Sequence, residues 1–304
     1  MKEVGNTKHA VELRKPSVSL ARIFHPSDFS SVSEVAFGHA LKLALEEKGA
    51  LTIMHVAAHI HPEGEERQWL RFPGVRTTLA RWGVLPERAR RDQVAALGLE
   101  VKKILASSSR ALDSMVRYLA EYPADLIVLA TYQREGLARW MHKSVAEPLA
   151  RRSGAMTLFV PPLGKTFVSL EDGSVTLKKI LIAADRKPDP QRALTSACSL
   201  ARGFGCLDAE FLLLHVGTET TAPVLNFTGL EDWRFEKILR QGNVVERVLQ
   251  VAADWNADLT VLATEGHLDF LDALRGSTTE RVLRESHCPV LAVPATTASS
   301  LQAI

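Results

Sequence analysis

Cysteine is scarce in this chain, which has only Cys198, Cys206 and Cys288 among its 304 residues. The number is odd and the neighbouring residues are largely apolar, so we expect buried thiols in a reducing compartment and no disulfide framework. None of the three has a partner at a spacing typical of metal ligands. The cysteines therefore favour an intracellular protein without a metal site.

An excess of charge of one sign is also missing. The chain has 37 Lys and Arg against 35 Asp and Glu, so its net charge gives no reason to expect nucleic acid or an anionic membrane as a partner. Its apolar runs are much shorter than a membrane span, and no apolar segment follows the charges at the amino terminus. We therefore expect a globular protein of the cytoplasm, without a transmembrane helix or signal peptide.

The sequence does contain an internal repeat of domain size. The segment Ala257-Asp-Leu-Thr-Val-Leu-Ala-Thr264 repeats Ala124-Asp-Leu-Ile-Val-Leu-Ala-Thr131, and both copies have His-Val at the end of an earlier apolar run, at His55 and His215. Strands that alternate with helices predict an α/β fold with a mainly parallel, doubly wound sheet in each copy. The predicted boundaries are a tail at 1–20, a first domain at 21–162, a linker at 163–177, a second domain at 178–296 and a tail at 297–304.

Apolar runs and helical periodicity predict the elements within each copy. Expected strands cover 22–26, 50–56, 99–105, 124–130, 155–160, 179–185, 211–216, 257–264 and 290–293. Expected helices cover 35–46, 107–121, 190–202, 243–255 and 279–285. Ser31 or Ser33 is the expected cap of the first helix.

Glycines punctuate the segment between the strand that ends near Ala263 and the helix near Thr278. Gly266 and Gly276 would let backbone amides approach a phosphate closely, and the helix start would add a partial positive charge. However, Ser277-Thr-Thr-Glu280 is also a capping box, which many helices have without a ligand. Phosphate binding and simple helix capping therefore both remain open from this segment alone.

The segment Ala263-x-x-Gly266-x9-Gly276-Ser277 resembles the nucleotide loop of the universal stress protein family, Gly-x-x-Gly-x9-Gly-Ser/Thr, with alanine in place of the first glycine. The flanking runs at 258–263 and 287–294 also resemble that family, and the resemblance extends upstream over most of the chain. It implies two Rossmann-like sheets of the adenine nucleotide alpha hydrolase type, in tandem and related by a pseudo-two-fold axis. It also implies ATP or another adenine nucleotide as the ligand, with Mg²⁺ as an option.

The resemblance places one nucleotide site in each half. In the second half its residues are Asp185, Val216, Ala263, Gly266, Gly276, Ser277 and Thr278. In the first half they are Pro26, Asp28, Val56, Ala130, Gln133, Lys143 and Ser144. The aspartates would hold the nucleoside, the second-strand valines would meet the adenine through their backbone, and the loops would hold ribose and phosphates. A turn or helix-capping role is the alternative for Asp28 and Asp185.

The first-half loop departs from the family pattern at its glycine positions, where Ala130, Gln133 and Lys143 stand. A non-glycine residue forced into a left-handed conformation costs roughly 1–2 kcal/mol, and its Cβ occupies space that a phosphate needs. Lys143 either pairs with a phosphate or fills an empty site, and we favour the second. We therefore predict an impaired first-half site and a better-formed second-half site.

An insert at about 57–97 distinguishes the first half. From Val56 to Ala130 is 74 positions, whereas from Val216 to Ala263 is 47, a difference of 27 residues. Arginines and aromatic residues alternate in the insert, a composition that can bind nucleic acid. Acidic residues are interspersed, however, and favour a solvated, self-paired helical excursion. The nearby His55, His59 and His61 approach metal-ligand spacing but have no acidic or cysteine partner at a matching interval.

Single-domain members of the family commonly dimerise through their last strands, and the resemblance implies the same joint within this chain, between 156–160 and 290–293. We expect an intrachain pseudo-dimer, with a homodimer left open, and protein partners that the sequence does not identify. No motif supplies a catalytic residue, so the expected role is a nucleotide-binding regulatory module. The alternatives are an interaction scaffold with decayed sites and a slow ATP hydrolase.

Overall fold

The structure is a computed structural model that describes residues 18–60, 62–131, 145–265 and 278–295. The first half of the molecule, defined here as β1 to β5, contains five strands. They are β1 (Arg22–Pro26), β2 (Ala50–Ala57), β3 (Glu100–Ser107), β4 (Leu126–Ala130) and β5 (Met156–Val160). Its helices are α1 (Ser31–Glu46), α2 (Pro62–Arg71), α3 (Val75–Arg81), α4 (Arg91–Ala96), α5 (Ala111–Glu121) and α6 (Ala146–Ser153).

The second half, β6 to β10, repeats this arrangement with fewer helices between its second and third strands. Its strands are β6 (Lys179–Ala183), β7 (Glu210–Val216), β8 (Arg234–Arg240), β9 (Leu259–Thr264) and β10 (Val290–Pro294). Its helices are α7 (Gln191–Gly203), α8 (Val244–Asp254) and α10 (Thr278–Glu285). None of the helices in the described ranges is long and apolar enough to cross a membrane.

The described strands form one ten-stranded sheet with the order β3-β2-β1-β4-β5-β10-β9-β6-β7-β8. The order reads the same from either end when each strand is replaced by its counterpart in the other half, as a pseudo-two-fold arrangement requires. Strands within each half pair in parallel, in the doubly wound order that the alternating pattern predicts.

The joint between the halves is the antiparallel pairing of β5 with β10, with Leu158 opposite Leu291 and Phe159 opposite Val290. Both strands are buried along their whole length. The predicted docking of the last strands is therefore confirmed. Each strand protects the other's backbone groups, which would otherwise form an exposed sheet edge.

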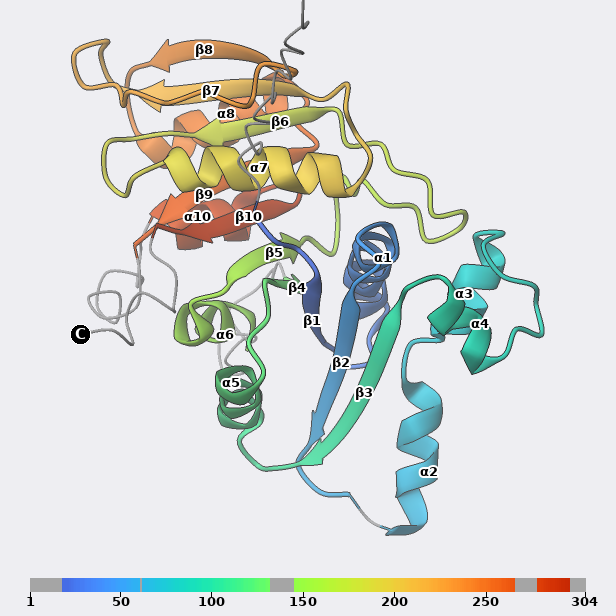
Figure 1. Ribbon diagram of the computed structural model, residues 1–304. Coiled ribbons are helices and arrows are strands. Elements are labelled where there is room, and N and C mark those ends of the chain that lie inside the picture. The colour runs from blue at the N-terminus through green and yellow to red at the C-terminus, as the bar shows by residue number, and fades with distance from the viewer. Residues whose placement is uncertain (1–17, 61, 132–144, 266–277, 296–304) are drawn as a thin grey trace, which may run out of the picture.

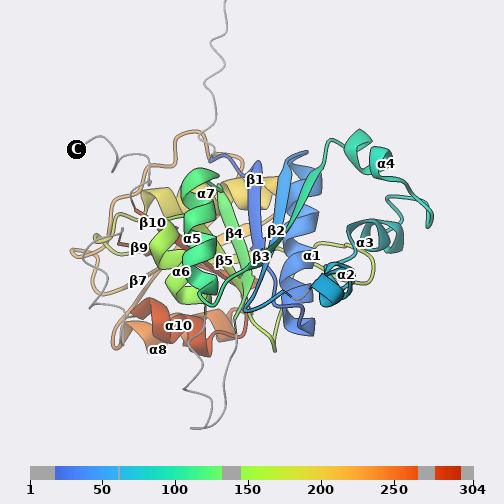
Figure 2. The ribbon, with the colours of Figure 1, turned by 90° about the horizontal axis from the view of Figure 1, so that it is seen from below.

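Helices cover both faces of the sheet, giving three layers (Figures 1 and 2). Buried residues of α1 and α7 share one hydrophobic core, and buried residues of α5, α6, α8 and α10 share the other. Because a two-fold axis perpendicular to the sheet keeps each face on the same side, equivalent helices of the two halves pack against a common face. The two cores therefore extend across the joint.

Three local expectations need correction. The first helix begins at Ser31, and its cap is Ser30, whose Oγ accepts the Ser33 amide at 3.1 Å. The strand β8 was not expected. The insert is helical as predicted, but it is not merely solvated, because the side chains of Phe72, Val75 and Leu79 are buried in the α1-side core.

Candidate functional site

The predicted first-half residues that the structure describes converge on one pocket of about 240 Å³. Pro26 ends β1, Ala130 ends β4, Val56 lies near the end of β2, and Asp28 follows β1 by two residues. All four line the pocket. It opens where β1 lies between β2 and β4, so the strand order reverses there and crossovers leave in opposite directions, the usual ligand site of such sheets.

Asp28 combines a position in this pocket with a structural role. Its Oδ1 accepts hydrogen bonds from the Ser30 amide at 3.0 Å and the Ser30 hydroxyl at 2.6 Å. Ser30 in turn caps α1 through Ser33. The turn role given above as the alternative for Asp28 is thus real, and it fixes the carboxylate at the rim of the pocket.

Two histidines hold the strand ends that form the pocket. His25 is fully buried, its Nδ1–H donates to the Val128 carbonyl at 2.9 Å, and burial lowers its pKa to about 4, so the ring is neutral. His55 lines the pocket, and its Nδ1–H donates to the Ser27 carbonyl at 2.7 Å. Burial, together with the charge of Arg71, lowers the pKa of His55. The neutral His25 ring thus links β1 to β4, and the His55 ring links β2 to the segment that follows β1.

Metal ligation gains no support in the part of the chain that the structure describes. No group of three or more His, Cys, Asp and Glu side chains there could hold an ion. The Nδ1 of His55 is engaged by a backbone carbonyl, and His61 lies outside the described residues.

Helices supply the remaining wall of the first-half pocket, and sequence reasoning missed these residues. Met115 comes from α5, Leu149 from α6, and Val145 precedes α6. In the sequence, an apolar residue that lines such a pocket cannot be distinguished from one that packs in the core, because both follow the same helical pattern. Only the packing of α5 and α6 over the strand ends brings it to the pocket.

In the second half, the described candidates occupy the matching places of the fold. Val216 ends β7, Ala263 lies one residue before the end of β9, and Thr278 begins α10. Asp185 follows β6, its side chain is 63% exposed, and its Oδ1 accepts the Arg186 amide at 2.7 Å. The start of α7 is served instead by Asp189, which accepts the Gln191 amide, so Asp185 is no helix cap.

The remaining predicted residues lie outside the described part of the chain. They are Gly266, Gly276 and Ser277 in the second half and Gln133, Lys143 and Ser144 in the first. The structure describes the strand and the helix that flank each loop.

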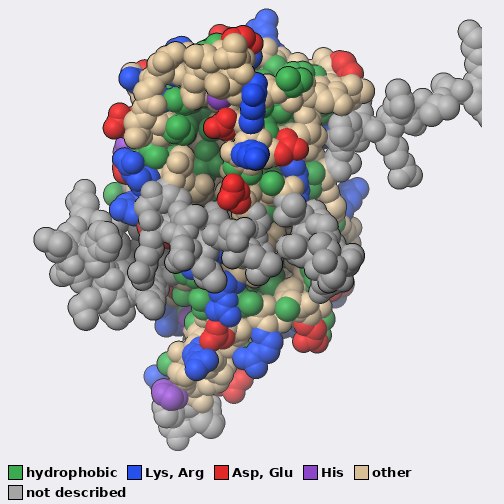
Figure 3. Space-filling model, turned by 90° about the vertical axis from the view of Figure 1, so that its left-hand side faces the viewer, with side chains coloured by type: hydrophobic (Ala, Val, Ile, Leu, Met, Phe, Trp, Pro, Cys, Tyr) green, Lys and Arg blue, Asp and Glu red, His purple; other side chains and the backbone are tan. Residues whose placement is uncertain are grey.

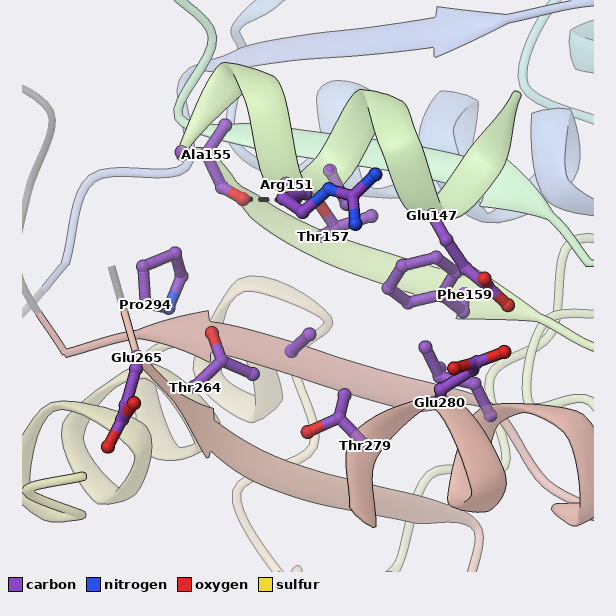
Figure 4. A pocket seen from close by; sticks show the side chains of 14 residues that line it. Glu147, Arg151, Ala155, Thr157, Phe159, Thr264, Glu265, Thr279, Glu280 and Pro294 are labelled. Atoms are coloured by element: carbon purple, nitrogen blue, oxygen red, sulfur yellow. Dashed lines mark hydrogen bonds between the residues drawn. The ribbon is translucent and has the colours of Figure 1, made fainter. Parts of the chain in front are cut away.

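A further pocket lies across the joint between the halves and was not predicted (Figure 4). Glu147 and Arg151 reach it from α6, Glu280 from α10, and Phe159 from β5. The carboxylates of Glu147 and Glu280 approach one another from the two helices (Figure 4). Burial, followed by the charge of Glu280, raises the pKa of Glu147. The charge of Glu280 on α10 thus acts on Glu147 of α6 across the joint.

Comparison with known proteins agrees with this architecture. The model of the universal stress protein family matches residues 20–161 and 230–294. This chain belongs to the universal stress protein family. A universal stress protein of Methanocaldococcus jannaschii is 26% identical in an alignment of length 151 that covers 41% of this chain and 86% of that protein.

Solved structures of similar length share the fold. A universal stress protein from Archaeoglobus fulgidus superposes with a TM-score of 0.60 at 18% identity, over 91% of this chain and 100% of the other. A Pseudomonas aeruginosa protein of unknown function gives a TM-score of 0.59 at 13% identity, over 91% and 93% of the two chains. These similarities establish the two-half fold as one that other chains adopt.

Proposed function

We propose that this universal stress protein is a stress-response regulatory module that binds ATP or another adenine nucleotide. The observation that carries the proposal is that the positions named by the family resemblance meet at the strand ends. In the first half Pro26, Asp28, Val56 and Ala130 line one pocket at the ends of β1, β2 and β4. In the second half, where we propose that the nucleotide binds, Asp185, Val216 and Ala263 occupy the matching places. The family resemblance assigned Pro26, Asp28 and Val56 to the nucleoside end of a nucleotide site, and Ala130 to the start of the loop. Their convergence supports the assignment, since a chance match of residue types would not require them to share a cavity.

We further propose that phosphates bind in the second half. There the helix start at Thr278 directly follows Gly276 and Ser277, so the amides of the first helical turn and the helix dipole would face a phosphate. The first half presents Gln133 and Lys143 at the corresponding loop positions. Loss of even two charge-assisted contacts of roughly 1.5–3 kcal/mol each would weaken binding by orders of magnitude.

Titration calorimetry with ATP tests the assignment of the nucleotide site to the second half, and we expect about one site per chain. Gly276→Lys copies the first-half residue into the second half and should abolish binding. Its matched control, Lys143→Gly, should leave the existing site intact. Unchanged affinity and stoichiometry in the Gly276→Lys protein would show that the second half is not the site.

A second pair of variants tests the nucleoside end. Asp185→Asn should weaken ATP binding about tenfold, as expected for loss of one charge-assisted hydrogen bond. Asp28→Asn should leave ATP binding unchanged. The reverse result would assign the nucleotide to the first-half pocket, where Asp28 lies.

Catalysis is proposed to be absent or very slow. Phosphoryl transfer needs an oriented nucleophile as well as charge stabilisation, and the second-half motif offers only the latter. Steady-state ATP turnover above about 1 s⁻¹, the low end for dedicated kinases, would contradict this. A thermal shift on addition of ATP, with and without Mg²⁺, separates a nucleotide binder from a scaffold without a working site.

A further inference from the structure

The second and third strands of the two halves are equivalent residue by residue. In the first half β2 pairs with β3 so that Ile53 lies opposite Lys103, and in the second half β7 pairs with β8 so that Leu213 lies opposite Lys237. Both lysines begin the same tripeptide, Lys-Ile-Leu. The same register makes His55 of β2 equivalent to His215 of β7.

In the first half, the insert fills the space beside this histidine and lysine. The Phe29 ring stacks on His55 with centroids 3.8 Å apart, and Phe72 packs against Phe29 at 5.1 Å. The Lys103 Nζ lies 5.8 Å from the centre of the Phe72 ring and donates to the Pro73 carbonyl at 2.9 Å. The equivalent surface is thus occupied by an aromatic ring next to an oxygen acceptor.

In the second half, the same surface borders an open cavity. The connection between the two strands covers residues 217–233, compared with 58–99 in the first half. His215 and Lys237 line a pocket of about 490 Å³ there. None of the described residues that we assign to the nucleotide lines it. In the space-filling view of this end of the sheet, hydrophobic side chains lie between charged ones (Figure 3).

The lining of this pocket is apolar except at a few positions. Its apolar side chains come from β7, β8 and the connection and include Leu213, Leu214, Ala222, Val224, Leu225, Phe227 and Phe235. Val224 is 98% exposed at the rim. A ligand with an apolar or aromatic surface would bury these side chains. Burial stabilises the complex by roughly 25 cal/mol per Å² of apolar surface removed from water.

Lys237 is the group that can select the charge of the occupant. Both ring nitrogens of His215 are already engaged, with the Ala184 carbonyl at 3.0 Å and the Thr221 hydroxyl at 2.8 Å. Among the described residues, the Nζ of Lys237 instead pairs with an exposed partner, the carboxylate of Glu219, at 2.5 Å. Glu219 is 72% exposed, so it can turn into solvent when another anion takes its place.

We propose that this pocket of the second half binds a small aromatic carboxylate. The ring of the ligand takes the place that Phe72 has in the first half. Its carboxylate displaces Glu219 and pairs with the Nζ of Lys237, just as the Pro73 carbonyl accepts a hydrogen bond from Lys103 in the first half. The pocket adjoins the proposed nucleotide site, because its lining residue His215 lies 3.9 Å from the Asp185 carboxylate, but the proposal does not depend on nucleotide binding.

Calorimetry with 1-naphthylacetate tests the proposal, with 1-naphthylmethylamine as a probe of the same ring and opposite charge. We expect the acid to bind and the amine to bind at least tenfold more weakly. Glu219→Gln removes the competing carboxylate and should tighten binding of the acid about three- to tenfold, whereas Lys237→Met should weaken it about tenfold or more. Lys178→Met, an exposed lysine outside the pocket, is the matched control and should change nothing.

Ala222→Phe should fill the pocket and remove binding of the acid, with thermal denaturation as the check of folding. If that variant does not fold, the opposite signs of Glu219→Gln and Lys237→Met decide alone. Absence of binding to the wild-type protein, preference for the amine, or full affinity in Lys237→Met would each overturn the proposal. ATP binding is measured in parallel, and its loss or retention bears only on the nucleotide site.

Discussion

The two halves of this protein share strand order and register but differ at the carboxyl ends of their strands. At the end of β1, His25 is buried and Asp28 is tied to Ser30, which caps α1. At the end of β6, Ile182 replaces His25. Asp185 accepts the amide of its neighbour Arg186, its Oδ1 lies 3.9 Å from the Nδ1 of His215, and its side chain is 63% exposed. The comparison shows that sheet packing constrains the strands closely, whereas the loops that would carry the sites are free to diverge.

The largest expected effect is on the free energy of unfolding, and it distinguishes the connection between β2 and β3 from the connection between β7 and β8. Phe72 is 5% exposed and packs in the core, so Phe72→Ala should lower the free energy of unfolding by about 3–5 kcal/mol. Phe227 is 37% exposed at the pocket of the second half, and Phe227→Ala should cost less than about 1 kcal/mol. Urea denaturation measures both. Equal losses would mean that the insert does not fill the first half as described.

A smaller effect concerns pH and His25. Its pKa falls from 6.5 to about 4 on burial, so the unfolded state binds more protons between these values. The free energy of unfolding should therefore fall as pH drops from 6.5 towards 4. Since a shift of one pKa unit corresponds to about 1.4 kcal/mol, the loss should reach up to ~3 kcal/mol. His25→Ile copies the second-half residue and should flatten this part of the profile.

The profile is followed by thermal denaturation at a series of pH values. His39, another buried histidine with a pKa lowered to about 4, serves as the control, because it retains its share of the slope in the His25→Ile protein. An unchanged slope in that variant would show that His25 is not buried in the neutral form.

The smallest effect concerns Glu147 at the joint. Its pKa is raised, so the folded state binds more protons than the unfolded state just above the ordinary glutamate pKa, and stability declines as pH rises through that range. Glu147→Gln should remove the decline and stabilise the protein at pH 7, by less than about 1 kcal/mol once solvent screening is included. Glu285→Gln on α10, outside the joint pocket, should have no such effect. Destabilisation by Glu147→Gln at pH 7 would contradict the assignment.

Much of the fold could be predicted from the sequence because its strands are continuous apolar runs. Strands such as β4 and β9 are covered by helices on both faces and therefore contain no charged residues. The strand β8 escaped prediction since it lies at the sheet edge, where Arg234, Glu236 and Arg240 are exposed. Its register with β7 is a tertiary fact that a local pattern does not contain.

The candidate site was predictable only in part, for a similar reason. Asp28 and Val56 could be placed together because parallel strands end at the same edge of a sheet. Met115 could not, since its place depends on how α5 crosses the strands. The pocket beside Lys237 was beyond prediction, because it results from the shortness of a connection and not from any motif.

The antiparallel pairing of β5 with β10 within one chain affects how the two halves can evolve and whether they stay associated at low protein concentration. Two identical subunits joined by such a ladder must carry the same residues at both sites, and they separate when their concentration falls. Here residues 161–178 tether the partners, and Lys165 in that tether forms an ion pair with Asp258 at 2.5 Å. Tethering replaces protein concentration by a constant effective concentration. The two halves therefore stay together on dilution, and a substitution in one half leaves the other half unchanged, so the two halves can change independently.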